Sequence, residues 1–329
     1  MNTKLKLYDL MPLLVVLAVC LIALSLISFP LWVNLTIAGL SVGIMIFLMA
    51  SGLTLIFGMM DVLNFAHAAL ITLAGYITAS VYFYLPGWVT SDSLALNILV
   101  IAMAALASII VTGILGFLTE RIIIRPVYGS HLKQVLVTTG VLIIIQQLAI
   151  AIWGADLVYV PQPGELKKVI TFGQIFIENY RLLICLTGLV LFAGMVWLLE
   201  RTRIGLLVRA AVEDREAVES LGYEAKYLFV GVFAVGSALA GLGGTFWSIY
   251  QEVVFPDAGL QIMIMVFSVI IIGGLGSVTG CFVASILLGL LMNYVGFLVP
   301  GAVVACGLIL LLAVLIWRPH GFYPVVVRR

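Results

Sequence analysis

The stretch LWVNLTIAGLSVGIMIFLMASGLTLIFGMMDVLNFAHAALITLAGYITASVYFY, residues 31–84, decides the fold class. It consists of two long apolar runs on either side of a polar break at 58–64. A run of about 20 apolar residues is long enough to cross a bilayer as a helix. Around the break, Asp61, Asn64 and His67 are spaced three residues apart, and this spacing raises the question of what polar groups do between two spans.

The composition extends this reading to the whole chain. Of its 329 residues, 64% are hydrophobic and 9% are charged, whereas soluble proteins carry about 25% charged residues. A soluble core could not bury so much apolar surface, so the composition predicts an all-α polytopic membrane protein with the lipid bilayer as its solvent. A net charge of +1 without a basic tract gives no indication of nucleic-acid binding.

The apolar runs predict about ten transmembrane helices in a single domain, 1–329. Eight or nine would follow if either of two interrupted segments were re-entrant. Long apolar runs are taken as helices because lipid-exposed backbone must satisfy its own hydrogen bonds. The expected spans are 10–29, 31–57, 65–84, 95–118, 135–153, 182–199, 228–250, 261–273, 281–298 and 302–317.

Lysine and arginine set the expected orientation, because cytoplasmic loops carry an excess of both. Basic residues precede the first span and follow the fourth, the sixth and the last, which places both termini in the cytoplasm. The loop 154–181 falls outside the membrane by this count and is expected to form a small external, periplasmic subdomain. Its Lys167, Lys168 and Arg181 weaken the rule.

Motifs for catalysis and metal binding are missing from the sequence. There is no G-x-x-x-x-G-K-[ST] phosphate loop, no H-E-x-x-H and no G-x-S-x-G. We therefore expect a transport subunit rather than an enzyme, with no cofactor of its own; if ATP drives transport, another chain hydrolyses it. The four cysteines, Cys20, Cys185, Cys281 and Cys306, lie inside apolar runs and are expected to be packing residues.

The segment ERTRIGLLVRAAVEDREAVESLGYEAKY, 200–227, is the most charged part of the chain. Within it, VRAAVEDREAVESLG predicts one short helix with Val212, Ala217 and Leu221 on one side, closed by Gly222 in a left-handed conformation. A solvated connecting loop is the plain alternative. The length, helical pattern and mixed charge of this cytoplasmic segment favour a helix that docks a peripheral partner.

Several of these stretches resemble one protein family. The motif E-D-x-x-A-x-x-x-L-G-Y in 213–223 is similar to the coupling segment of ABC-importer permeases, and the closest resemblance is to the high-affinity branched-chain amino acid permeases. The stretches 52–70, 269–291 and WRPHGFY at 317–323 agree with it in the same order. One departure is Ala68, where relatives commonly carry glycine after N-F-A-H.

The resemblance implies a permease in the bacterial inner membrane that works with other chains. These are a second permease subunit (a paralogue or a second copy), two cytoplasmic ATPase subunits that hold ATP and Mg, and a periplasmic solute-binding protein. It implies as substrate a branched-chain amino acid or a related amino acid, amide, urea or carboxylate. It also places contacts to the ATPases at Glu213, Asp214, Glu216, Ala217, Ser220, Leu221 and Gly222.

The two interrupted segments are the candidate translocation pathway, because interrupted helices at corresponding positions of two halves point to a solute path. Gly58-x-x-Asp61-x-x-Asn64 aligns with Gly273-x-x-Gly276-x-x-Thr279. Both breaks fall on the cytoplasmic side, which favours a parallel relation, although transporters commonly have inverted repeats. The glycines could equally mark tight helix crossings. The candidate pathway residues are Asp61, Asn64, His67, Gly274, Gly276, Ser277 and Thr279.

The roles within the first break stay open between structure and function. Asp61 is either an N-cap of the following helix or an acid beside the pathway, and one role does not exclude the other. His67 is expected to be a hydrogen-bonded packing residue rather than a substrate ligand, and no metal site is expected. A proton- or ion-coupled secondary transporter that uses Asp61 and His67 is the main rival to the importer, and a membrane enzyme is a remote third.

Overall fold

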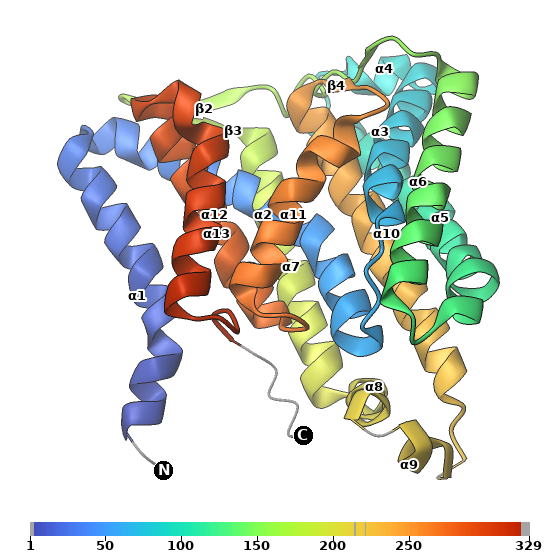
Figure 1. The fold of residues 1–329 in the computed structure, drawn as a ribbon. Helices are drawn as coiled ribbons and strands as arrows, with labels where there is room; N and C mark the ends of the chain where they lie inside the picture. The colour runs from blue at the N-terminus through green and yellow to red at the C-terminus, as the bar shows by residue number, and fades with distance from the viewer. Residues whose placement is uncertain (1–2, 214, 221, 324–329) are drawn as a thin grey trace.

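The computed structural model describes residues 3–213, 215–220 and 222–323. In this part of the chain ten apolar helices form one bundle (Figure 1). They are α1 (Thr3–Leu26), α2 (Phe29–Met60), α3 (Ala66–Tyr84), α5 (Leu94–Leu118), α6 (His131–Trp153), α7 (Asn179–Arg201), α10 (Ala225–Gln251), α11 (Ala258–Gly273), α12 (Val278–Leu298) and α13 (Val303–Trp317). Each corresponds to one predicted span, so the all-α polytopic prediction is confirmed.

Shorter elements connect these helices. At one end of the bundle lie the helix α4 (Pro86–Val89) and the strands β1 (Val158–Tyr159), β2 (Val169–Phe172), β3 (Ile175–Glu178) and β4 (Val253–Val254). At the other end lie the helices α8 (Arg203–Glu213) and α9 (Arg215–Ser220). A π-helical turn (Thr119–Ile124) and two 3-10 turns (Arg125–Val127 and Pro300–Ala302) complete the elements. The two ends are called here the β4 end and the α8 end.

Helix α2 forms the centre of the bundle and packs against α10, α12, α7 and α11. Residues 45–50 of α2 are fully buried, as expected for a helix that is apolar on every side. Close approach depends on glycine: a Cβ added to Gly52 would lie 2.1 Å from the carbonyl oxygen of Gly236 in α10. Small residues at a crossing allow helices in a membrane to gain van der Waals contact between their backbones.

The β4 end is closed by the segment 154–181, which carries strands β1, β2 and β3. Strands β2 and β3 form an antiparallel hairpin, and β1 pairs antiparallel with β4. The segment is tied down further by Lys167, whose Nζ lies 3.1 Å from Oε1 of Glu252. The hydrogen bond from Lys167 to Glu252, together with the charge of that carboxylate, raises the pKa of Lys167, which therefore stays protonated at neutral pH.

The ten helices differ in the length of their apolar segments. Eight have the length and apolar composition needed to cross a bilayer, and two have shorter apolar segments, Leu10–Leu26 and Ala258–Gly273. The second of these is α11, the predicted span with the shortest apolar run. In the described part of the chain the four cysteines are unpaired, and Cys281 is fully buried.

Candidate functional site: two helix breaks and an end segment

The first break begins where α2 ends, and Asp61 has a different role from the one predicted. Asp61 is the C-cap of α2, in the left-handed conformation (φ 52°, ψ 38°), and its N–H donates to the Phe57 carbonyl at 2.9 Å. The N-cap of α3 is Phe65. The N-cap prediction for Asp61 was therefore wrong: α2 continues three residues beyond its predicted end, and aspartate is among the residues that tolerate a left-handed backbone.

The Asp61 carboxylate points out of the bundle. Its side chain is 69% exposed, and Oδ2 lies 3.5 Å from Nε2 of His131 in the first turn of α6. The contact is an ion pair only when His131 is protonated, and an ion pair this exposed contributes about 0–1 kcal/mol to stability. Asp61 is thus a surface residue of the break and does not form a pair with His67.

Asn64 and His67 turn the opposite way, into the core, and both are fully buried. His67 lies in α3, and its Nε2 is 2.8 Å from the carbonyl oxygen of Met49 in α2. This confirms the packing interpretation of His67. Asn64 precedes α3 and accepts the His67 N–H through its own carbonyl at 3.4 Å. Its side-chain amide has no hydrogen-bond partner among the described residues.

The second break lies between α11 and α12 and is built on glycine. Gly274 and Gly276 have φ of 99° and 80°, a region that side-chain-bearing residues rarely adopt. Ser277 is the N-cap of α12, and its Oγ accepts the Gly280 N–H at 3.1 Å. Thr279 follows in the first turn and is exposed. The cap keeps the start of α12 fixed directly after the turn.

The two breaks, more than 200 residues apart in sequence, touch each other. A Cβ added to Gly58 would lie 2.2 Å from the Cα of Gly276. In Figure 1, α2 and α11 both run toward the α8 end, and α3 and α12 both return from it. The breaks therefore lie at the same end of the bundle, which agrees with the parallel relation and shows one of the predicted tight crossings.

A third segment, WRPHGFY at 317–323, packs against the second break. The N–H groups of Phe322 and Tyr323 donate to the carbonyls of Ile272 and Gly273 at 2.8 and 3.0 Å. The buried Arg318 guanidinium donates from Nη1 to the Phe322 carbonyl at 3.0 Å. The end segment WRPHGFY thus clamps the second break against the bundle. The motif is visible in the sequence, but the sequence does not show that it packs against the second break.

With this geometry in place, comparisons with known proteins identify the family. Residues 35–317 match the family model described as "Branched-chain amino acid transport system / permease component". The chain belongs to this permease family. The resemblance noted in the sequence is therefore confirmed, and the permease is a multi-pass membrane protein of a branched-chain amino acid transport family.

Individual relatives belong to the same kind of transport system. The permease is 30% identical to the high-affinity branched-chain amino acid transport system permease protein BraD of Pseudomonas aeruginosa, over 86% of this chain and 92% of that one. It is 24% identical to the permease protein LivH of Escherichia coli, over 77% and 82% of the two chains. A shorter match, 28% identical over 43% of this chain, is to LivM of Escherichia coli. No solved structure matches the chain.

The predicted coupling segment of the permease lies at the α8 end, beyond the ends of α2 and α11 (Figure 1). Its described residues form the helices α8 and α9 on either side of residue 214, which lies outside the described residues. Val208, Ala211 and Val218 are buried, and Ala211 and Val218 pack with Leu228 and Phe229 of α10. The segment is therefore anchored to the bundle by its apolar face.

Gly222 closes this segment as predicted. Its φ is 87°, its N–H donates to the Glu219 carbonyl at 3.0 Å, and the Tyr223 N–H donates to the Val218 carbonyl at 3.3 Å. This pair of bonds is the Schellman arrangement that satisfies the last carbonyls of a helix. Of the predicted coupling residues, Ser220 and Gly222 are described in full, and both are exposed. Asp214 and Leu221, and the side chains of Glu213, Glu216 and Ala217, lie outside the described residues.

Proposed function

We propose that the permease is the membrane-spanning subunit of an ATP-driven importer. It moves a branched-chain amino acid, or a related amino acid, amide, urea or carboxylate, that a periplasmic binding protein delivers. The observation that carries the proposal is the segment of α8 and α9, a folded unit anchored at one end of the bundle and unnecessary for crossing the membrane. Two cytoplasmic ATPase subunits, which hold ATP and Mg, would dock there, at Glu213, Asp214, Glu216, Ala217, Ser220, Leu221 and Gly222.

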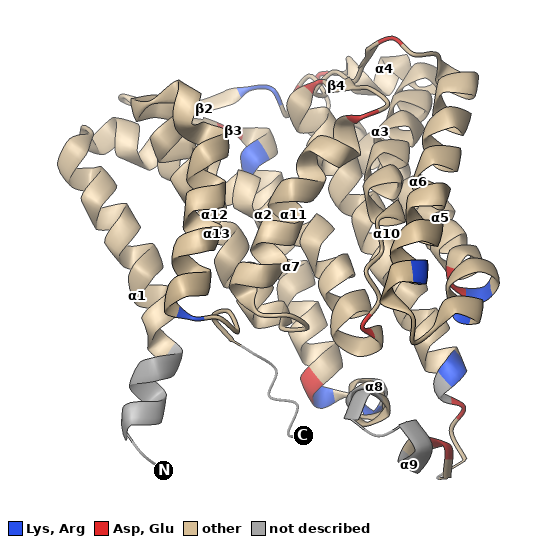
Figure 2. Cartoon of the chain, viewed as in Figure 1, with Lys and Arg blue, Asp and Glu red and all other residues tan. Residues whose placement is uncertain are grey.

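The distribution of charge supports the orientation that this function needs. Figure 2 shows lysine and arginine gathered mainly toward the α8 end. Because basic residues are enriched on the cytoplasmic side of inner-membrane proteins, the α8 end is the cytoplasmic end in this proposal. The chain enters α1 and leaves α13 at that end, so both termini are cytoplasmic, and 154–181 is periplasmic.

A second permease subunit completes the proposed transporter. The matches to LivH and LivM, two permease proteins of one organism, favour a paralogue as this subunit, with a second copy of the chain as the alternative. Helix α13 is suited to a partner or to lipid, since only 6% of its span is buried within the chain.

The two breaks and their contact form the cytoplasmic end of the proposed solute path, with Asp61, Asn64, His67, Gly274, Gly276, Ser277 and Thr279 around it. The rival function, a proton-coupled secondary transporter, would need Asp61 and His67 to act together. Asp61 instead faces His131, and His67 binds the Met49 carbonyl. That geometry favours the ATP-driven importer.

Docking is tested with two glycine substitutions. Gly222 and Gly173 both have positive φ and open space where a side chain would extend, but they lie at opposite ends of the bundle. We expect Gly222→Trp to abolish co-purification of the ATPase subunits and ATP-dependent uptake of L-leucine, because the bulky ring blocks the docking surface. Gly173→Trp, the matched control for backbone strain, is expected to retain the ATPases.

Membrane levels of both variants are measured by immunoblot, so that failed insertion is distinguished from failed docking. Normal ATPase binding by a membrane-inserted Gly222→Trp protein would contradict the docking assignment. The double variant Glu213→Arg, Gly222→Trp adds a reversed charge on the same segment and is expected to show the same loss.

A further inference from the structure

Helix α11 is too short to cross a bilayer alone. Its 16 residues extend about 24 Å at 1.5 Å per residue, whereas the hydrocarbon core is about 30 Å thick. We infer from the contacts described next that the non-helical chain before it, 252–257, completes the crossing. Such backbone is tolerated within a membrane only where protein buries it or where it lines an aqueous cavity.

Contacts place the start of α11 inside the bundle. The Gly259 N–H donates to Oγ1 of Thr72 at 2.8 Å, and Thr72 lies about 18 Å along α3 from the end of that helix. Asp257 accepts a hydrogen bond from Gln146, which lies about 10 Å along α6 from its end. The chain therefore enters the bundle from the β4 end before α11 begins.

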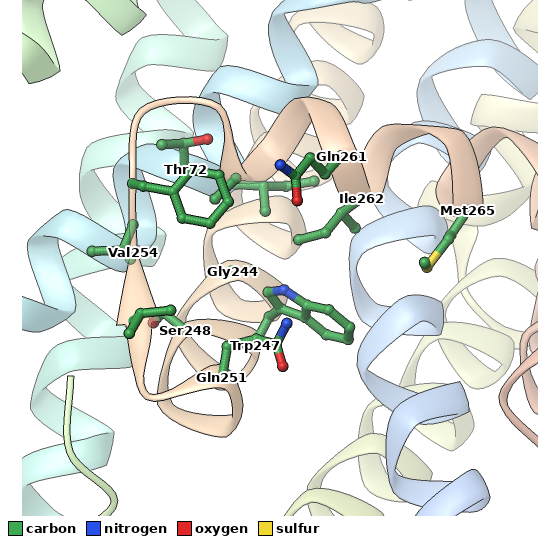
Figure 3. Close-up of a pocket in the computed structure, with 14 residues that line it drawn as sticks. Thr72, Gly244, Trp247, Ser248, Gln251, Val254, Gln261, Ile262 and Met265 are labelled. Carbon is green, nitrogen blue, oxygen red and sulfur yellow. The ribbon is translucent and has the colours of Figure 1, made fainter. Parts of the chain in front are cut away.

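A cavity of about 130 Å³ lies where this entering chain meets α3 and α10 (Figure 3). A cavity of about 150 Å³ can hold a six-carbon ring, and this one is close to that size. Strand β4 and Phe255 form part of its wall, Thr72 and Gly75 contribute from α3, and Trp247 from α10. The non-helical backbone thus lines a cavity, as its position in the bundle requires.

The lining combines amides with apolar groups. Gln251 reaches the cavity from α10 and Gln261 from α11, with the Trp247 ring between them in the view of Figure 3. Ile262 and Met265 supply apolar wall from α11. None of the described lining residues is an aspartate, glutamate, lysine, arginine or histidine. The N–H groups of the first turn of α11 are already bonded within the protein, so the side chains of Gln251, Gln261 and Trp247 offer the donors for a ligand.

We propose that this cavity is a solute-holding site on the transport path, for a net-neutral small molecule that carries an apolar group. The proposal rests on the transport function above and adds the residues that select the solute. Each glutamine amide offers donors and an acceptor, so Gln251 and Gln261 can bind both ends of a zwitterion while Trp247 and Ile262 cover its apolar part. No lining residue carries a charge that could pair with a charged solute, so the lining favours a net-neutral one.

Two lining residues that the cavity shares with a second space support a path rather than a closed pocket. Gln261 and Met265 also line a groove of about 330 Å³ between α11, α12 and α13. The same face of α11 therefore borders both spaces, with Met265 between them. A solute that leaves the cavity meets Met265 and then the apolar groove, in which Met292 and Gly307 face it.

Access to the cavity is tested by thiol labelling of the complete transporter in detergent, in a background with the four native cysteines replaced by alanine. Ser248→Cys places a thiol in the cavity wall, and Ser285→Cys places one at a fully buried site in α12. The reagents are neutral methyl methanethiosulfonate and its negatively charged sulfonatoethyl analogue. Rates are divided by those of the exposed Gly87→Cys to remove differences in reagent reactivity.

We expect the neutral reagent to label Ser248→Cys about tenfold faster, or more, than Ser285→Cys, and the charged reagent to label it about tenfold more slowly than the neutral one. Labelling of Ser248→Cys as slow as that of Ser285→Cys, or equal rates for the two reagents, would overturn the proposal. This result does not depend on transport, so it remains decisive if the proposed function fails.

Solute selection is tested by uptake of L-leucine and L-valine. Gln251→Leu and Gln261→Leu remove the two amides, and each is expected to lower uptake about tenfold while the ATPases still co-purify, because a hydrogen bond to a charged end of the solute is lost. Gln147→Leu, on the exposed face of α6, is the matched control and should transport normally.

Wild-type uptake by both glutamine variants with intact assembly would overturn the cavity proposal. Absence of leucine and valine uptake in the wild-type transporter would instead contradict the proposed substrate class and leave the labelling test to decide the cavity. Loss of ATPase binding in the glutamine variants, with Gln147→Leu normal, would assign these residues to folding and overturn their role in selection.

Discussion

At the scale of single residues, the first break separates two kinds of polar group that look alike in sequence. Asp61 is exposed and ends a helix in a left-handed conformation, whereas His67 is fully buried and binds the carbonyl of Met49. Asn64 is buried without a side-chain partner among the described residues. A buried amide in this state is costly unless something else binds it, which keeps Asn64 a candidate for contact with water or solute.

The role of Asp61 is tested by two substitutions that separate charge from backbone. Asparagine tolerates the left-handed conformation, so Asp61→Asn removes only the charge, whereas Asp61→Val adds strain of about 1–2 kcal/mol at the end of α2. We expect Asp61→Asn to reach normal membrane levels with clearly reduced L-leucine uptake, and Asp61→Val to lose protein as well. Uptake and immunoblots measure both. Unchanged uptake in Asp61→Asn would reduce Asp61 to a dispensable C-cap.

At the scale of elements, contacts between backbones decide how the helices assemble. Gly58 of α2 lies against Gly276 of the second break, and the end segment 317–323 binds the other side of that break. Helix α11 approaches α3 just as closely: a Cβ added to Gly259 would lie 1.9 Å from the Ala68 carbonyl oxygen. At Ala68, the close approach between α3 and α11 is therefore provided by Gly259 of the opposite helix.

Substitution of Gly58 tests the contact between the breaks. Gly58→Ala places a methyl group 2.2 Å from the Cα of Gly276, so the two segments must separate. We expect this variant to lose about 1–3 kcal/mol of stability, the usual cost of overpacking. Gly140→Ala in α6, where nothing lies within 4 Å of the added methyl, is the control and is expected to be neutral or slightly stabilising. Thermal unfolding in detergent compares them, and an equal Tm for both would show that the breaks are not held together at Gly58.

At the scale of the whole molecule, the two ends of the bundle differ in charge and in structure. The α8 end carries α8, α9 and most of the basic residues. The β4 end carries short strands, of which β1 pairs with β4 and β2 with β3. The proposed solute-holding cavity is lined in part by strand β4, and the two breaks meet toward the α8 end. In the proposed transporter a solute would pass from the β4 end to the α8 end.

The orientation is tested by labelling from one side of the membrane. Tyr223 follows α9 and Gly87 lies in α4, and both are exposed at opposite ends of the bundle. With a membrane-impermeant thiol reagent on intact spheroplasts, we expect Gly87→Cys to react and Tyr223→Cys to react only after the membrane is opened. The reverse pattern would place the α8 end outside and contradict docking to cytoplasmic ATPases.

Much of the architecture could be predicted from local sequence. The ten helices follow from apolar runs, because a helix in lipid satisfies its own backbone and needs no partner to form. Gly222 was correctly predicted as a helix terminator, since a positive φ is a local property of glycine. The cap at Asp61 was assigned to the wrong helix, because an aspartate between two apolar runs can end one helix or begin the next, and residues 58–60 continue α2.

The amino-acid sequence by itself thus determined the fold class, the spans, the family and the two breaks between apolar runs. All of these depend on short-range patterns in the sequence. Only the tertiary structure decided that the breaks touch, that the end segment clamps one of them, and that α11 begins inside the bundle beside a cavity. These features join residues that lie far apart in the sequence, 218 positions in the case of Gly58 and Gly276. They arise from the close approach of glycine backbones, and hydrophobic periodicity does not specify which helix a given glycine will meet.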